Sequence, residues 1–180
     1  MTRHHQGGFT IIEVVVVCAI IAVLAAVAIP AFTNQSAKVK GESEASPMLA
    51  EIASRQGQAF TELGAYVSSS AAEGTTYPTA PSTTAVAWGS PTGGWASLRV
   101  VPTQASVRCA YVTIAGAAGT GPASGSIADT YFAFSGTQAG PWYYALARCD
   151  MDRTTGTSDK DSWYFISSAN AQLQTKFSGR

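Results

Sequence analysis

The sequence predicts an α+β protein in which the second half of a long N-terminal helix packs on a small antiparallel β-sheet. Three observations predict it: an apolar run near the N-terminus, an amphipathic segment after it, and short strand-like stretches separated by Gly, Pro, Ser and Thr. The chain has 180 residues, which suits one modest core with an appendage. We expect the helix over 9–64 and a globular β head over 65–180.

The helix begins in a run long enough to cross a membrane. Every residue over 14–29 is apolar, and 9–12 extends the run except at Thr10. At 1.5 Å per residue, a helix over 9–29 would be roughly 30 Å long, close to the hydrocarbon thickness of a bilayer. Arg3 is the fixed positive charge of the short polar segment before the run. It predicts a cytoplasmic N-terminus and an exported remainder.

Glu13 is the charged residue inside this run. A carboxylate costs roughly 2.5–3.5 kcal/mol near the centre of a bilayer and less near its edge, so such a residue usually has a partner. A free α-amino group at Phe9, with a pKa of about 7.7–8, would be largely protonated at neutral pH. The amine of a neighbouring subunit, displaced along a bundle of parallel helices, would reach Glu13 more readily than the amine of the same helix.

Two other interpretations compete with a retained helix. Ala26-Val27-Ala28 fits the cleavage site of a secretory signal peptide, which would release a soluble, monomeric binding domain. Cys18 would be the modified residue of a lipoprotein, but Val17 precedes it where lipidation needs a small residue. Glu13 argues against the signal peptide, which gains nothing from a carboxylate. We therefore interpret Cys18 and the alanines of the helix as a close-packing surface.

The string GGFTIIEVVVVCAIIAVLAAVAIPAF resembles the N-terminal signature of type IV pilins and the related pseudopilins. The resemblance implies that a prepilin peptidase cuts after Gly8, removes 1–8 as a leader, and methylates the new amine of Phe9. It also implies that Glu13 neutralises a neighbour's N-terminus and sets the register of assembly with Phe9. Pro30 stands where the family has a helix-bending proline, so a kink is expected there. The part over 9–30 would form the membrane span and later the filament core.

The function implied is that of a structural subunit of a type IV pilus-like filament, serving adhesion, surface motility or DNA uptake. Expected partners are further copies of the chain, the prepilin peptidase, and an inner-membrane assembly machinery with a separate ATPase. The precursor would lie in the inner membrane and the assembled protein at the cell surface. Alternatives within the family are a pseudopilin of a type II secretion system and a minor pilin. Nothing in the sequence indicates whether nucleic acid is bound.

The second half of the helix is amphipathic. Gly41 and Pro47 predict a break or kink over 41–47, and Gly64 predicts the helix end. The expected sheet-facing residues recur at three- and four-residue steps: Leu49, Ile52, Ala53, Gln56, Ala59, Phe60 and Leu63. A neighbouring charged group is interpreted as a solvated face, or alternatively as pairing between subunits: Lys38, Lys40, Glu42 and Glu44.

The head is expected to hold an antiparallel meander packed on the helix as a second layer. Three prolines predict a loop region before it. The expected strands are Ala96–Val101, Ser106–Ala115, Trp142–Cys149 and Ser162–Ser167. A long connection over 116–141 would join the two central strands, and such connections are often functional.

Cys109 and Cys149 are expected to form a disulfide, with two free thiols as the alternative. An exported chain lies where disulfides persist. If the second and third strands are adjacent and antiparallel, the start of one faces the end of the other, which places the two cysteines opposite. Closing a loop of about 40 residues would stabilise the fold by roughly 3–4 kcal/mol.

Asp150 and Asp152 resemble the start of a calcium loop, within CDMDRTTGTSDKDSW. Arg153 stands among the candidate ligands, and the glutamate of the twelfth position is missing. These departures favour a turn between the last two strands, with Asp and Gly used for turn geometry. We therefore expect no cofactor, with calcium kept as an alternative.

The composition gives no sign of an enzyme. There are 11 basic and 11 acidic residues, so no basic field indicates nucleic acid. The sequence has no Gly-rich phosphate loop, zinc-like cysteine pair or nucleophile elbow. His4 and His5 lie in the segment expected to be removed. A mature chain without histidine lacks the commonest general base.

Overall fold

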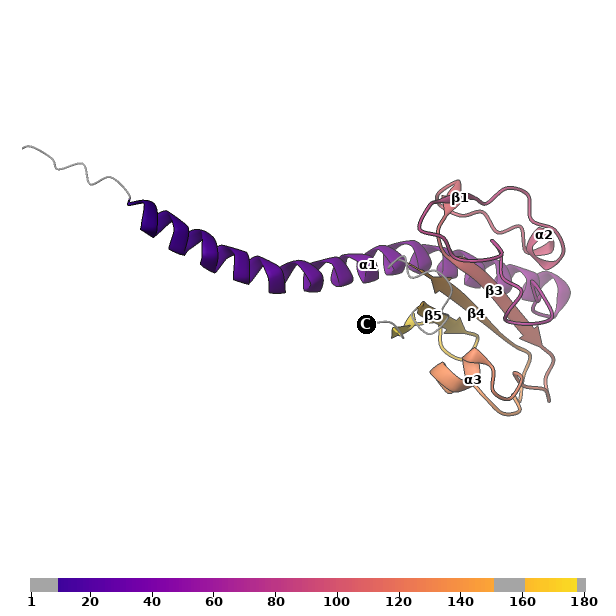
Figure 1. Ribbon diagram of the computed structural model, residues 1–180. Helices are drawn as coiled ribbons and strands as arrows, with labels where there is room; N and C mark the ends of the chain where they lie inside the picture. The colour runs from indigo at the N-terminus through magenta and orange to yellow at the C-terminus, as the bar shows by residue number, and fades with distance from the viewer. Residues whose placement is uncertain (1–9, 151–160, 178–180) are drawn as a thin grey trace, which may run out of the picture. The chain divides into compact units, whose positions relative to one another are not determined.

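The computed structural model describes residues 10–150 and 161–177, and at 30–38 and 177 it describes the backbone alone. The described elements follow the order α1, β1, α2, β2, β3, α3, β4, β5 and β6 (Figure 1). The chain divides into two compact units, Met1–Ser36 and Ala37–Arg180, which we call the N-terminal and C-terminal units. The predicted α+β class is confirmed, since an apolar helix is followed by further helix and antiparallel sheets.

α1 (Ile11–Leu63) is a single α-helix of 53 residues. Of the break or kink predicted over 41–47, the break is wrong, because the helix runs through it, and the kink stays a prediction. Pro47 forfeits one backbone hydrogen bond, but Ala45 and Met48 beside it are buried, and packing of this face outweighs that loss. The predicted end is confirmed: Gly64 has φ 71°, and its N–H donates to the Phe60 carbonyl at 2.9 Å.

Gly41 is a point of close contact between α1 and the sheet. A Cβ at this position would lie 2.7 Å from the hydroxyl oxygen of Tyr164. That tyrosine is fully buried and cannot swing away. Burial, and then the Glu42 carboxylate, raise the pKa of Tyr164 to about 12, so its phenol is neutral at physiological pH. Gly41 is therefore in the helix for close packing and does not break it.

Gly41→Ala is expected to lower the free energy of unfolding by about 1–3 kcal/mol, because the added methyl group overpacks the contact with Tyr164. The cost should largely vanish in a Tyr164→Phe background, where the colliding oxygen is gone. Gly57→Ala is the matched control. Gly57 is exposed in the same helix with nothing near its Cβ position, so alanine there should stabilise by up to about 1 kcal/mol. Thermal unfolding of the detergent-solubilised protein is measured for the two glycine variants, for Tyr164→Phe and for Gly41→Ala combined with Tyr164→Phe. Equal effects of alanine at the two glycines would contradict the contact.

The main sheet is an antiparallel meander in the order β3-β4-β5-β6. Two predicted strands are confirmed residue for residue, β4 (Trp142–Cys149) and β5 (Ser162–Ser167). The strand expected over 106–115 is divided into β2 (Ser106–Val107) and β3 (Ala110–Gly116). β2 pairs with β1 (Val86–Ala87) in a separate two-stranded sheet. The fourth strand of the meander is β6 (Gln174–Phe177), which the sequence did not predict.

The strand predicted at Ala96–Val101 is wrong. This stretch begins inside α2 (Gly94–Leu98), a short helix that buries Trp95 and Leu98 one turn apart. Gly94 lies so close to the Ser68 backbone that a Cβ would collide with it. Arg99 adopts the left-handed conformation at φ 52° and ends the helix. Burial of these two side chains in the core decides this element, and local propensity does not.

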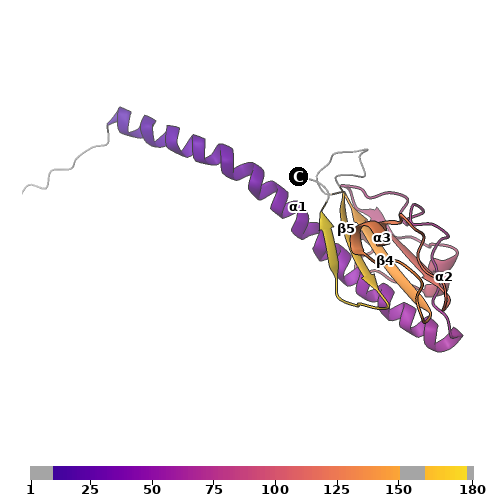
Figure 2. The same ribbon diagram turned by 90° about the horizontal axis from the view of Figure 1, so that it is seen from below.

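The main sheet is covered on both faces. Successive side chains of a strand point to opposite faces. One face packs on α1 with Tyr111, Tyr164 and Ile166. The other packs on α3 (Ile127–Phe132), and Figure 2 shows α3 over β4 and β5 on the side away from α1. The sequence predicted one helix on one sheet and missed the third layer. That layer is α3, which belongs to the long connection over 116–141.

Candidate functional site

The N-terminal unit exposes a long apolar surface. Ile11–Ile29 has a mean hydropathy of 3.1, and none of it is buried inside the protein. By length and composition this segment of α1 can cross a membrane. Its large side chains are not covered by other parts of the protein: Ile11 is 86% exposed and Val27 is 74% exposed. A surface of this kind needs lipid or another protein to cover it.

Glu13 lies in the first turn of α1, at the start of this surface. Its backbone N–H donates to the carbonyl and the hydroxyl of Thr10, at 3.2 and 3.3 Å, so Thr10 caps the helix. A carboxylate in the first turn is favoured by the helix dipole. The side chain is exposed, so it is open to a cation on another molecule. Gly8 and Phe9, the expected cleavage and methylation positions, lie outside the described residues.

Two further predictions concern the same helix. Cys18 carries a free, exposed thiol, as a residue of a packing surface would. Pro30 lies within α1. The kink predicted there stays a prediction.

Glu44 is not part of a solvated face, which corrects that interpretation. Its Oε1 accepts hydrogen bonds from the backbone N–H groups of Arg108 at 2.6 Å and Cys109 at 2.7 Å, and from the Tyr111 hydroxyl at 3.3 Å. Burial, and then this carboxylate, raise the pKa of Tyr111. Glu44 therefore fastens α1 to the start of β3. No local sequence pattern marks this role, because the groups that Glu44 binds lie more than sixty residues further along the chain.

The expected disulfide between Cys109 and Cys149 is present, with the Cα atoms 4.3 Å apart. Both residues are buried in the core between α1 and the sheet. The pairing of Ala110 with Arg148 continues to the two cysteines, so the register itself brings them together. The strand-pairing argument from the sequence predicted this geometry.

The calcium hypothesis is not supported by a ligand cluster. Asp150 follows β4 and is buried, whereas Asp152 lies outside the described residues. Asp161 forms an ion pair with Arg148. Within 10–150 and 161–177, no three Asp, Glu, His or Cys side chains gather as metal ligands would. Calcium at this place stays an untested alternative.

One known family model matches the N-terminal part of the sequence, which contains this exposed apolar helix. Residues 3–29 match the model of the prokaryotic N-terminal methylation motif. Neither the curated proteins nor the solved structures contain a match to the chain. The fold and the exposed helix define a protein with a membrane-competent N-terminal helix and a globular α+β unit. The motif is the signature of type IV pilins and pseudopilins, and the resemblance stated from the sequence is confirmed.

Proposed function

We propose that the chain is a structural subunit of a type IV pilus-like filament and assembles through the N-terminal half of α1. The observation that carries this proposal is Glu13, a single exposed carboxylate at the start of an uncovered apolar helix, inside the methylation motif. In a bundle of parallel copies, the apolar faces bury one another and release water or lipid. Glu13 supplies the register, because burial of its charge requires a neighbour's amine.

Processing follows from the same motif. A prepilin peptidase cuts after Gly8 and methylates the amine of Phe9, and the methylated amine keeps its positive charge. The precursor lies in the inner membrane with a cytoplasmic N-terminus and an exported C-terminal unit. A separate ATPase of the assembly machinery drives extraction from the membrane, and the finished filament stands on the cell surface.

The proposed role is non-enzymatic and needs no cofactor. Its support is the motif, because the pilin-type family is structural. The chemistry of assembly is burial of apolar surface and pairing of charges, both supplied by the chain itself. Adhesion, motility and DNA uptake are all compatible with a filament of this kind. The pseudopilin alternative differs in location, since such a filament would stay in the periplasm.

Intact mass and N-terminal sequencing of the protein from the membrane and from sheared surface material test the proposal. The expected result is a chain that begins with N-methylated Phe9 in the sheared fraction. A chain beginning at Ile29 in the soluble fraction would instead establish a signal peptide and overturn the proposal. Methylated protein confined to the membrane and periplasm would favour the pseudopilin.

Glu13→Gln is expected to leave the precursor inserted and cleaved but to lower sheared filament at least tenfold. Removing one partner of a buried ion pair costs about 3–5 kcal/mol, because the other charge stays buried without compensation. Glu62→Gln is the control, since Glu62 is an exposed carboxylate in the C-terminal unit's part of α1. Quantitative immunoblots of membrane and sheared fractions measure both variants. Wild-type filament levels in Glu13→Gln would contradict the assigned role.

A further inference from the structure

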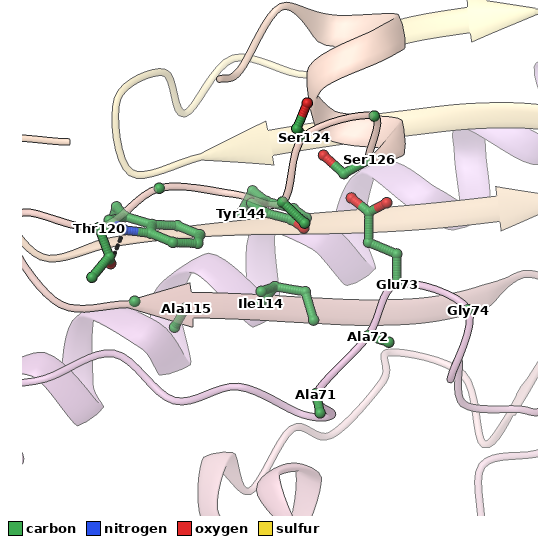
Figure 3. A pocket seen from close by; sticks show the side chains of 15 residues that line it. Ala71, Ala72, Glu73, Gly74, Ile114, Ala115, Thr120, Ser124, Ser126 and Tyr144 are labelled. Carbon is green, nitrogen blue, oxygen red and sulfur yellow. Dashed lines mark hydrogen bonds between the residues drawn. The ribbon is translucent and has the colours of Figure 1, made fainter. Parts of the chain in front are cut away.

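A groove lies on the C-terminal unit at the end of β3 and the start of β4. Its volume is about 630 Å³, within the range of small-ligand sites. Figure 3 shows its floor, formed by Ile114 and Tyr144, between two segments that rise on either side. One wall is 71–74 and the other is 120–126, from the long connection that also carries α3. Neither the methylation motif nor the proposed assembly uses this groove.

The wall over 120–126 is held in place by bonds of its own. The backbone N–H of Gly119 donates to the Gln138 carbonyl at 2.9 Å, and that of Gln138 donates to the Thr120 carbonyl at 2.8 Å. The indole N–H of Trp142 donates to the Thr120 hydroxyl at 3.0 Å, drawn as a dashed line in Figure 3. Gly121 lies so close to Gly136 that a Cβ would collide with its carbonyl. The groove is therefore preformed, and a ligand need not order it.

Glu73 is the charged side chain that lines the groove. Its carboxylate accepts hydrogen bonds from the backbone N–H groups of Ile127 at 2.6 Å and Ala128 at 3.2 Å. Burial, and then this carboxylate, raise the pKa of Tyr144. Two backbone donors thus stabilise the negative charge. A carboxylate has about four acceptor positions, so acceptor positions remain for a ligand.

The lining selects against charged ligands. Among the described residues that line the groove there is no Lys, Arg or His, so a phosphate or carboxylate would find no counter-charge there. A cation has little to gain from Glu73, whose charge the protein's own donors already stabilise. The described residues gather no three metal ligands here or elsewhere. Of these classes of ligand, the lining therefore favours an uncharged one that donates hydrogen bonds.

Hydroxyl and apolar groups alternate around the groove. Ser124 and Ser126 lie on one wall, and the Ser126 hydroxyl faces Glu73 of the other (Figure 3). The half-buried Ile114 supplies apolar contact on the floor. Trp142 and Tyr144 also line the groove but are buried, so they offer little open surface for stacking. Hydrogen bonds, more than stacking, would hold the ligand.

We propose that this groove binds a short uncharged saccharide of one or two rings. Sugar hydroxyls donate to the open acceptor positions of Glu73 and pair with the Ser126 hydroxyl of the opposite wall, while the C–H face of a ring lies on Ile114. This is a binding activity of the isolated subunit, and it is independent of filament assembly.

The test uses the full chain, solubilised in a detergent without a sugar headgroup, so that the detergent does not compete. Lactose, maltose and cellobiose are the probes, with hexylammonium and inorganic phosphate as charged controls. Saturation-transfer NMR measures binding. We expect millimolar binding of at least one disaccharide and none of the two controls. Binding of a charged control alone, or of no disaccharide, overturns the proposal.

Two variants locate the binding. Ser124→Phe adds a large ring at an exposed residue that lines the groove, and Glu73→Gln removes the charge; each should weaken disaccharide binding at least fivefold. Ser54→Phe adds the same ring at an exposed position of α1 away from the groove and should change nothing. Because Glu73 also supports α3, thermal unfolding is measured for each variant. If Glu73→Gln proves to be unfolded, the test of the site rests on Ser124→Phe. Undiminished binding in Ser124→Phe overturns the site.

Discussion

Removal of the Cys109–Cys149 disulfide is expected to lower the free energy of unfolding of the C-terminal unit by about 4 kcal/mol. The bridge spans 40 residues, and the chain-entropy model gives that value for a closed loop of this length. Cys109→Ala with Cys149→Ala also leaves a small cavity, because both cysteines are buried in the core. The melting temperature should fall by roughly 10–20 °C. Near-ultraviolet circular dichroism follows the tryptophan-rich core as it unfolds.

Cys18→Ala is the matched control for this experiment. It also removes a cysteine sulfur, but from an exposed position in the N-terminal unit, so the melting temperature of the C-terminal unit should not change. A double variant that melts within about 2 °C of the wild type would show that the bridge contributes little, as some engineered bridges do through strain.

The strands predicted correctly from the sequence are those buried on both faces. β4 and β5 read as almost continuous aromatic and aliphatic runs, because α1 covers one face and α3 the other. β6 is short and includes Gln174 and Lys176, so no apolar pattern marks it. α2 was mistaken for a strand because a five-residue element is too short to show a helical period. Tertiary contact, not local pattern, decides both of these elements.

The candidate assembly segment was predictable because its signal is local. Glu13 inside an apolar run can be recognised without knowledge of the fold, and so can the motif around it. Glu44 and Glu73 could not be recognised in this way. The backbone groups that each carboxylate binds lie more than fifty residues further along the chain. Their partners are known only once the long connections are placed.

Gln56 is a third long-range contact, and its replacement should have one of the largest effects on stability. The side chain was predicted to face the sheet, and it is fully buried. Its Nε2 donates to the Val67 carbonyl at 2.6 Å and to the Thr113 hydroxyl at 3.0 Å, and its Oε1 accepts from the Val67 N–H at 2.9 Å. The amide thus holds the chain reversal after α1 against the sheet.

Gln56→Leu is expected to lower the free energy of unfolding by about 3–5 kcal/mol at every pH between 3 and 8. It leaves the N–H and carbonyl of Val67 without their partner, and each buried unpaired group costs about 1–3 kcal/mol. Gln56→Glu should be at least as damaging at neutral pH. A buried carboxylate loses hydration, and it faces the Val67 carbonyl where the amide donated.

The free energies of unfolding of the two variants should change relative to each other as the pH falls. Burial raises the pKa of a glutamate above its unfolded value of about 4.3, so the folded Gln56→Glu protein binds the proton more tightly than the unfolded chain does. Relative to Gln56→Leu, its stability is therefore greatest below about pH 4.3 and is lost as the pH rises through the folded-state pKa. A protonated carboxyl group also donates one hydrogen bond, as the amide did. Urea unfolding at pH 4 and pH 7 measures the difference in free energy of unfolding between the two variants. This difference should shift in favour of Gln56→Glu by at least 1 kcal/mol at the lower pH. A constant difference would mean that the side chain at this position escapes to solvent.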